Sequence, residues 1–259
     1  MSTNTSNNAC GKNGSFAKRD LFGGAMSCNI PSEWRDVSGV RQVPDHQEVY
    51  QDCTTLSTSS PPSEYVGTGG CLIVEILQRQ EDVDDIDAAK FFFDDLADAN
   101  GCDSAEQHGR HIFASQVVTV GGFGGNTREE DTEHDVSQNL VPNLAKTVYN
   151  ACTCIGIQRI AMGRDHDISG RKRTDQETRT TKIELCALRL EDVQTDLLIT
   201  LTMPHVTKSD NAEGTTDMIR MMQGESKEGV TGADGQVSHG SLFQNILKSF
   251  VVNDWTLFA

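Results

Sequence analysis

The stretch Cys71-Leu-Ile-Val-Glu-Ile-Leu77 decides the fold class, because it is almost wholly apolar. A short apolar run of this kind is typical of a strand that is covered on both faces. Glu75 interrupts the run, and a carboxylate inside such a strand needs a hydrogen-bond partner or an exposed position. The stretch therefore predicts a strand inside the molecule, with other structure packed on each of its faces.

A helix is predicted directly after this strand, from Asp84 to Asn100. Asp84 or Asp85 can cap its N-terminus, the acids of its first turn complement the helix dipole, and Asn100-Gly101 is a typical helix end. The apolar residues that share one face at helical spacing are Ala88, Ala89, Phe92, Leu96 and Ala99. A helix that follows a strand buried on both faces indicates a layered arrangement of helices and sheet.

Further strands are predicted on both sides of this unit. The apolar runs 182–190 and 195–203 are separated by Glu191-Asp-Val-Gln194, and this spacing predicts a β-hairpin. Other strand-like runs lie at 26–31, 48–52, 112–120 and 152–162.

Three helical segments are also expected outside this unit. Ser32 can cap a short helical turn that runs through Val37, and a helix over 140–148 would have Pro142 in its first turn. Ser241 can cap a final helix. The apolar stripe of that helix consists of Leu242, Phe243, Ile246, Leu247 and Phe250.

The composition restricts the class of partner. The chain has 259 residues, a formal net charge of -16 and a pI of about 4.7. Nucleic acids and anionic lipids attract basic surfaces, so we expect neither a nucleic acid nor a membrane as partner. A basic protein, or a basic patch on a protein, fits this charge better. No apolar run is long enough for a membrane span, and the polar N-terminus lacks the apolar stretch of a secretory signal.

The cysteine pattern indicates a reducing compartment. The eight cysteines are scattered, without the paired spacing of a disulfide framework or a zinc ribbon. Several lie in apolar runs, where Cys behaves as a small hydrophobic residue. We therefore expect reduced thiols and a protein of the nucleus and cytoplasm.

Segments of low apolar content separate an ordered body from loops. Residues 1–18 are predicted to be a disordered tail, and 19–259 a single domain. Surface loops are expected at 54–70 and 121–138, and loop insertions at 163–181 and 205–240.

The segment Arg41-Gln-Val-Pro-Asp-His-Gln-Glu-Val-Tyr50 combines a rigid turn with charge. Pro44 fixes its own φ and favours an extended residue before it, and Asp45 can set a tight turn. Gln47 and Glu48 would then enter a strand and point to opposite faces. Such a turn holds carboxylates in a fixed geometry, which suits a protein-binding edge. The alternative is a turn with a structural role alone.

Enzyme and metal signatures are incomplete in this chain. G-x-S-x-G, H-E-x-x-H and Walker sequences are absent, and the glycine-rich segment 120–126 lacks the Lys-Ser/Thr of a phosphate loop. His108 and His111 lie close in sequence to Cys102 and Asp103, so a metal protein or enzyme is one hypothesis, although the ligand set is incomplete. We instead expect a protein without cofactor that acts by binding. The cluster Arg171-Lys-Arg173 is either a charged loop or a short nuclear localisation patch.

Several short motifs occur in an informative order. They are Leu21-Phe-Gly-Gly-Ala25, Ile30-Pro31, Asp36-Val-Ser38, the segment 41–50, Ala187-Leu-Arg-Leu190, Thr195-Asp-Leu-Leu-Ile-Thr200 and Asp254-Trp-Thr-Leu-Phe258. In this order and spacing the chain resembles the Ran guanine-nucleotide release factor family, the Mog family of nuclear import proteins. The resemblance covers about 20–100, 182–204 and 242–259, and it is poor from 101 to 181.

The resemblance implies a fold, an activity and a site. The fold would be an α+β, PsbP-like α/β/α sandwich, with a mostly antiparallel sheet of about six strands and helices on both faces. The activity would be binding of the small GTPase Ran and promotion of guanine nucleotide release in nuclear import, by a monomer without cofactor. The motifs place the partner-binding residues at Asp36, Arg41, Asp45, Gln47, Glu48, Glu75 and Gln78. Gln78 departs from the family pattern, which has a carboxylate there.

Two questions stay open at this point. The acids of 81–87 and Asp94-Asp95 either serve the helix dipole and solubility, or add negative field around the Asp45–Glu48 turn. The departure at Gln78 and the long insertions also allow a second function on the same fold, that of an adaptor module with a different protein partner.

Overall fold

The structure is a computed structural model, and it describes residues 15–52, 69–102, 109–120, 140–144, 149–161, 178–204 and 239–258. A seven-stranded sheet in the order β3-β4-β5-β9-β8-β7-β6 forms its middle layer, and all of its paired strands are antiparallel. Its strands are β3 (Trp34–Asp36), β4 (Gln47–Asp52), β5 (Cys71–Gln78), β6 (Arg110–Val120), β7 (Tyr149–Ala161), β8 (Thr178–Leu190) and β9 (Thr195–Pro204).

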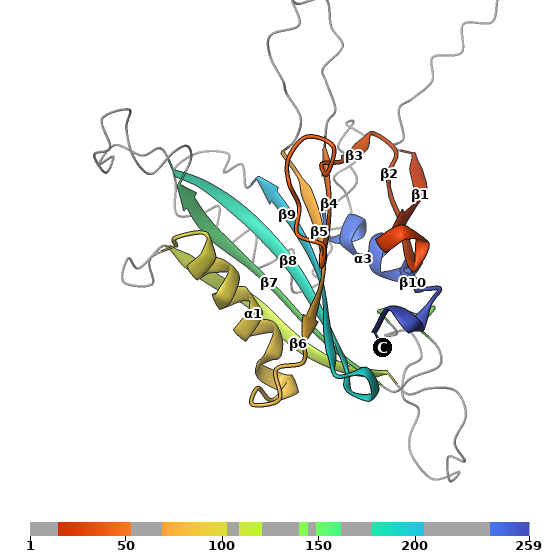
Figure 1. Cartoon of the computed structure of the whole chain (residues 1–259). Helices are drawn as coiled ribbons and strands as arrows, with labels where there is room; N and C mark the ends of the chain where they lie inside the picture. Colours follow the sequence, from red (N-terminus) through yellow and green to blue (C-terminus); the bar gives the residue numbers. More distant parts are fainter. Residues whose placement is uncertain are drawn as a thin grey trace, which may run out of the picture.

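The large sheet is covered on both faces, as predicted. Helix α1 (Asp85–Ala99) packs on one face, and helix α3 (His239–Ser249) lies on the other (Figure 1). A second antiparallel sheet, in the order β1-β2-β10, accompanies α3 on that face. Its strands are β1 (Phe16–Leu21), β2 (Met26–Pro31) and β10 (Val251–Val252). The fold is therefore α+β and layered, with seven strands in the central sheet where the family resemblance implied about six.

The alternation of side chains along the central strands produces two separate apolar cores. In β8, Leu185 and Ala187 belong to the core beneath α1, whereas Cys186 and Leu188 belong to the core beneath α3. Successive side chains of a strand point to opposite faces, so one apolar strand can supply both cores. This is why the central strands have almost continuous apolar sequences.

The predicted central hairpin is confirmed. β8 and β9 pair along their length and are joined by the 3₁₀ turn η3 (Glu191–Val193). Gln194 follows this turn with a φ of 50°, in the left-handed region, and its N–H donates to the carbonyl of Glu191. The hairpin lies near the centre of the sheet, with β5 on one side and β7 on the other.

Helix α1 starts and ends where the sequence predicts. Asp84 is the residue before its first turn, but its side chain makes no capping hydrogen bond, and Gly101 adopts a φ of +68° after the last turn. The N–H groups of Gly101 and Cys102 donate back to the carbonyls of Asp98 and Ala97, which is the Schellman arrangement of helix ends. The expected apolar stripe needs one correction. Ala99 is exposed, and the buried residues of the helix are Ala88, Ala89, Phe92, Phe93 and Ala97.

Two short helical predictions were wrong. The segment Ser32–Val37 contains strand β3, because Trp34 is buried in the core and the backbone pairs with β4. These tertiary contacts outweigh the capping potential of Ser32. Residues 140–144 form a turn closed by the N–H of Leu144 on the carbonyl of Val141, and 145–148 lie outside the described residues.

The final helix has the predicted apolar stripe, but it begins earlier than predicted. Leu242, Phe243, Ile246, Leu247 and Phe250 are all buried in the core beneath it. The helix starts at His239, so Ser241 lies within it and does not cap it.

The boundaries of the expected tail and insertions also move. β1 begins at Phe16 and β8 at Thr178, so 16–18 and 178–181 belong to strands. Most of the expected tail, loops and insertions fall in 1–14, 53–68, 121–139, 162–177 and 205–238, which lie outside the described residues. The division into a disordered tail and one domain stays a prediction.

A buried ion pair fixes the hairpin to the connection between β5 and α1. Arg189 of β8 and Asp196 of β9 face each other in register, and the Nε of Arg189 donates to the Oδ1 of Asp196 at 2.8 Å. Both side chains are buried. The guanidinium also donates to the carbonyls of Gln80 and Val83 at 2.6 and 2.8 Å, and Asp196 accepts the N–H of Gln80 at 2.9 Å. This cluster therefore positions the segment that leads from β5 into α1.

Replacing Arg189 with Ala is expected to lower the free energy of unfolding by about 3–5 kcal/mol, because Asp196 is left buried without its counter-charge. Urea unfolding would measure this change. The matched control is Arg110→Ala, which removes a partly exposed guanidinium that pairs with Asp94 and Asp98 of α1. Its cost should be about 1 kcal/mol or less. Equal losses in the two variants would contradict the role given to Arg189.

Candidate functional site

The turn predicted within the segment 41–50 is exposed at one edge of the large sheet, and we call its residues 44–48 the acidic corner. The N–H of Gln47 donates to the carbonyl of Pro44 at 2.9 Å and closes the turn, with Asp45 and His46 exposed at its centre. The carbonyl of His46 in turn accepts the N–H of Ile76 at 2.9 Å. The turn is thereby fixed to β5, and the carboxylate of Asp45 is presented to solvent.

Gln47 and Glu75 form a pair on the α1 side of the sheet. They are opposite each other on β4 and β5, and the Nε2 of Gln47 donates to the Oε1 of Glu75 at 2.5 Å. Burial raises the pKa of Glu75, and the hydrogen bond from Gln47 opposes this increase. Glu75 therefore has the partner that an interrupting carboxylate requires, and the pair links the turn to the central sheet.

Glu48 points to the other face, as predicted, but its carboxylate has an internal partner. Its Oε1 accepts the N–H of Phe22 at 2.8 Å. Phe22 begins the 3₁₀ turn η1 (Phe22–Gly24), which connects β1 to β2. The acceptor and the donor are 26 residues apart in sequence. Glu48 thus joins the acidic corner to the small sheet.

Asp36 is the last residue of β3 and Arg41 lies in the connection from β3 to β4, and both are exposed. The carboxylate of Asp36 accepts the N–H and the hydroxyl of Ser38 at 2.8 and 2.7 Å, so it stabilises its own turn. Burial raises the pKa of Cys71 to about 11, and the nearby guanidinium of Arg41 opposes this increase. Arg41 therefore acts electrostatically on the start of β5, whereas Asp45 lies just before the start of β4.

Gln78 is exposed at the last position of β5, in register with Thr195. It shares a sheet face with Glu48 rather than with Glu75, because side chains alternate along β5. The structure therefore brings the predicted residues together along β3, β4 and β5 but divides their side chains between the two faces of the sheet.

Tyr50 is a residue of this region that the sequence did not identify as functional. It is buried, and its hydroxyl donates to the carbonyl of Asp20 at 3.3 Å. Burial raises its pKa, and the carboxylates of Glu48 and Asp36 add to the increase. Tyr50 is opposite Asp36 in the β3–β4 pairing, and its hydroxyl connects β4 to β1. The sequence feature that could have identified Tyr50 is its place at the end of the segment 41–50.

Asn253 brings the C-terminal segment to the same region. Its Nδ2 donates to the carbonyl of Gly24 at 3.0 Å, and its N–H donates to the carbonyl of Ala25 at 2.8 Å. Asp254 also donates its N–H to Ala25, at 3.0 Å. Three motifs that are distant in sequence, at 21–25, 41–50 and 254–258, therefore meet around the η1 turn.

The groups of the metal hypothesis have other contacts in the structure. Cys102 is buried and donates to the carbonyl of Arg159, and the ring of His111 contacts that of Phe113. Asp103 and His108 lie outside the described residues. Within the described ranges, no group of three or more His, Cys, Asp or Glu side chains could hold a metal ion. None of the described helices is long and apolar enough to cross a membrane.

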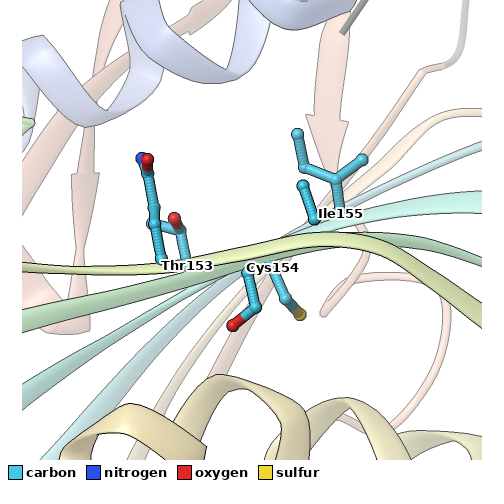
Figure 2. Close-up of a pocket in the computed structure, with 6 residues that line it drawn as sticks. Thr153, Cys154 and Ile155 are labelled. Atoms are coloured by element: carbon cyan, nitrogen blue, oxygen red, sulfur yellow. The ribbon is translucent and has the colours of Figure 1, made fainter. Parts of the chain in front are cut away.

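A surface cavity between β6 and β7 does not gather reactive groups. Figure 2 shows that Thr153 and Ile155 point to one side of the sheet and Cys154 to the other, toward α1. Cys154 donates to the carbonyl of Ala89, and burial raises its pKa to about 12. Its thiol is therefore held in the protonated form, which is a poor nucleophile.

Comparison with known proteins identifies the family. The family model described as Ran-interacting Mog1 protein matches residues 19–204. This chain belongs to the Mog1 family. The matched range contains the acidic corner, the η1 turn and the central hairpin.

Individual Mog1 relatives agree with this assignment. The Ran guanine nucleotide release factor of Bos taurus is 31% identical over 189 residues, which cover 71% of this chain and 74% of the relative. The probable Ran guanine nucleotide release factor of Dictyostelium discoideum is 26% identical over 244 residues, 94% of this chain and 97% of the relative. The crystal structure of the Ran-binding protein Mog1p of Saccharomyces cerevisiae superposes with a TM-score of 0.55 at 20% identity, covering 95% of this chain and 99% of that one. The structural likeness confirms the fold.

Replacing Glu75 with Gln is expected to stabilise the protein at pH 7. Because the pKa of Glu75 is raised in the folded protein, its ionisation at neutral pH lowers the free energy of unfolding. This loss of stability is absent below the unfolded carboxyl pKa of about 4. It develops as the pH rises from there through the pKa of Glu75 in the folded protein. Urea unfolding should show a more stable variant at pH 7 and a difference that shrinks toward pH 4. The exposed Glu81→Gln control should change stability by less than about 0.5 kcal/mol. A destabilised Glu75→Gln at pH 7 would refute this interpretation.

Proposed function

We propose that this protein binds a Ran-type GTPase and promotes release of its guanine nucleotide in nuclear protein import. Membership of the Mog1 family is the observation that carries the proposal. This chain matches most of the length of several relatives, which are named Ran guanine nucleotide release factor or nuclear import protein. We further propose that it acts as a monomer in the nucleus and cytoplasm.

The proposed mechanism is release by binding, without covalent chemistry. A small GTPase holds its nucleotide through a P-loop lysine and Mg²⁺. A partner that stabilises the nucleotide-free form lowers the affinity for nucleotide by the same factor by which nucleotide lowers the affinity for the partner. The protein therefore needs a complementary surface and no catalytic group.

The exposed turn at Asp45 supports a contact with a basic face of the GTPase. Asp45 is solvent-exposed, and the hydrogen bonds at Gln47 and His46 hold its turn in place, so little conformational entropy would be lost on binding. Glu75 lies behind the turn with its charge only partly screened by water. The net charge of -16 would speed encounter with a basic partner.

The second candidate function is an adaptor module on the same fold with a different protein partner. The observation that favours it is the neutral, exposed side chain of Gln78 at a position where the family resemblance implies a carboxylate. An adaptor would bind its partner without changing the rate of nucleotide release from a Ran-type GTPase.

A nucleotide-release assay distinguishes the two candidates. Wild type should accelerate loss of a fluorescent guanine nucleotide from a Ran-type GTPase, and Asp45→Lys should reduce this effect by about tenfold or more, since a like charge against a basic face costs over about 1.4 kcal/mol. The matched control is Asp98→Lys, because Asp98 pairs with Arg110 of β6 at the opposite edge of the sheet. This control should release nucleotide at the wild-type rate.

Each alternative outcome of this assay has a distinct meaning. Wild-type protein without effect on release, but with a different protein partner in solution, would support the adaptor. Acceleration that Asp45→Lys leaves intact would support release while removing the acidic turn from the binding surface.

A further inference from the structure

We infer that the turn Leu21–Ala25 is a second part of the partner-binding surface, and that Glu48 is a positioning residue that holds this turn in place. The inference rests on the proposed function and assigns different roles to the residues of the acidic corner. Asp45 supplies an exposed charge, whereas Glu48 supplies support to a neighbouring turn.

The turn has a left-handed backbone conformation that is unfavourable at Phe22 alone. Phe22, Gly23 and Gly24 have φ angles of 50°, 66° and 96°, so three consecutive residues lie in the left-handed region. A residue with a side chain costs about 1–2 kcal/mol in that region. Phe22 therefore keeps this conformation only because its surroundings impose it.

Contacts from two distant parts of the chain hold the turn. The carboxylate of Glu48 accepts the N–H of Phe22, and the side-chain amide of Asn253 donates to the carbonyl of Gly24. The N–H groups of Asn253 and Asp254 both donate to the carbonyl of Ala25. These contacts fix the main chain at the beginning, middle and end of the turn.

The outer side of the turn is open. Gly23 is exposed, and a Cβ placed on Gly23 or Gly24 would meet no atom within 4 Å. At these two positions, glycine is therefore not required by close packing against the rest of the molecule. Glycine adopts the left-handed region without strain, and the absence of side chains at Gly23 and Gly24 allows close approach of a partner's main chain.

The contact of Glu48 argues against a direct charge contact from this residue. Its carboxylate is half-buried and already accepts a main-chain N–H. A partner cation that drew the carboxylate away would leave the Phe22 N–H without its acceptor and would release the turn. Loss of Glu48 should therefore weaken partner binding through the shape of the turn.

The first arm of the test separates support from charge at Glu48. Glu48→Gln keeps an oxygen acceptor for the Phe22 N–H but removes the charge, whereas Glu48→Ala removes both. Calorimetry with a nucleotide-free Ran-type GTPase should give a dissociation constant within about threefold of wild type for Glu48→Gln. For Glu48→Ala, binding should be at least about tenfold weaker than wild type. Near-normal binding by Glu48→Gln is a result that a charge contact does not produce.

The second arm adds bulk to the outer side of the turn without removing any charge. Asn tolerates the left-handed region, so Gly23→Asn keeps the turn and places a side chain on its open side. The matched control is Gly101→Asn at the end of α1, where φ is +68° and the surroundings are equally open. Gly23→Asn should weaken GTPase binding by about tenfold and Gly101→Asn by less than about twofold, with similar small losses of stability in both.

The outcomes distinguish this inference from the proposed function. If wild type binds but Glu48→Gln is as weak as Glu48→Ala, Glu48 is a charge contact and its positioning role is wrong. If wild type binds and Gly23→Asn binds equally well, the turn lies outside the surface. If wild type fails to bind the GTPase in any nucleotide state, the proposed function is wrong and this inference falls with it.

Discussion

The buried pair of Arg189 and Asp196 is the interaction on which the positions of the other elements depend. It lies across the central hairpin and also binds main-chain groups of Gln80 and Val83, between β5 and α1. β5 carries β4, and the carbonyl of His46 is bonded to β5 at Ile76. The geometry of the exposed turn thus depends on charges placed more than a hundred residues later in the chain.

Two neighbouring residues of the same short motif have different physical roles. Gln47 faces the α1 side and supports Glu75, while Glu48 faces the other side and supports the η1 turn. This division follows from the strand itself, because consecutive side chains of β4 must point to opposite faces. Of the polar residues 45–48, only Asp45 and His46 are exposed, whereas Gln47 and Glu48 already have partners inside the protein.

The sequence predicted those features that depend on local periodicity and end signals. The central hairpin, the α1 boundaries and the apolar stripe of α3 are of this kind. The prediction failed where tertiary contacts override local preference, as when burial of Trp34 draws Ser32–Val37 into a strand. The site residues predicted from the motif stay a prediction. The contacts of Glu48 with Phe22 and of Asn253 with Gly24 join residues 26 and 229 positions apart, and no periodicity reports such pairs.

The bond between Asn253 and Gly24 also has a consequence for biosynthesis. At ribosomal speeds of about 5–20 residues per second, the first glycines emerge on the order of tens of seconds before the amide that holds them. β2 likewise lacks one of its hydrogen bonds until α3 has been made, because the Ser249 hydroxyl of α3 accepts the N–H of Asn29. A nascent chain therefore lacks the finished η1 turn until translation has passed residue 253, and a ribosome stalled earlier would carry a chain without the Asn253 contact.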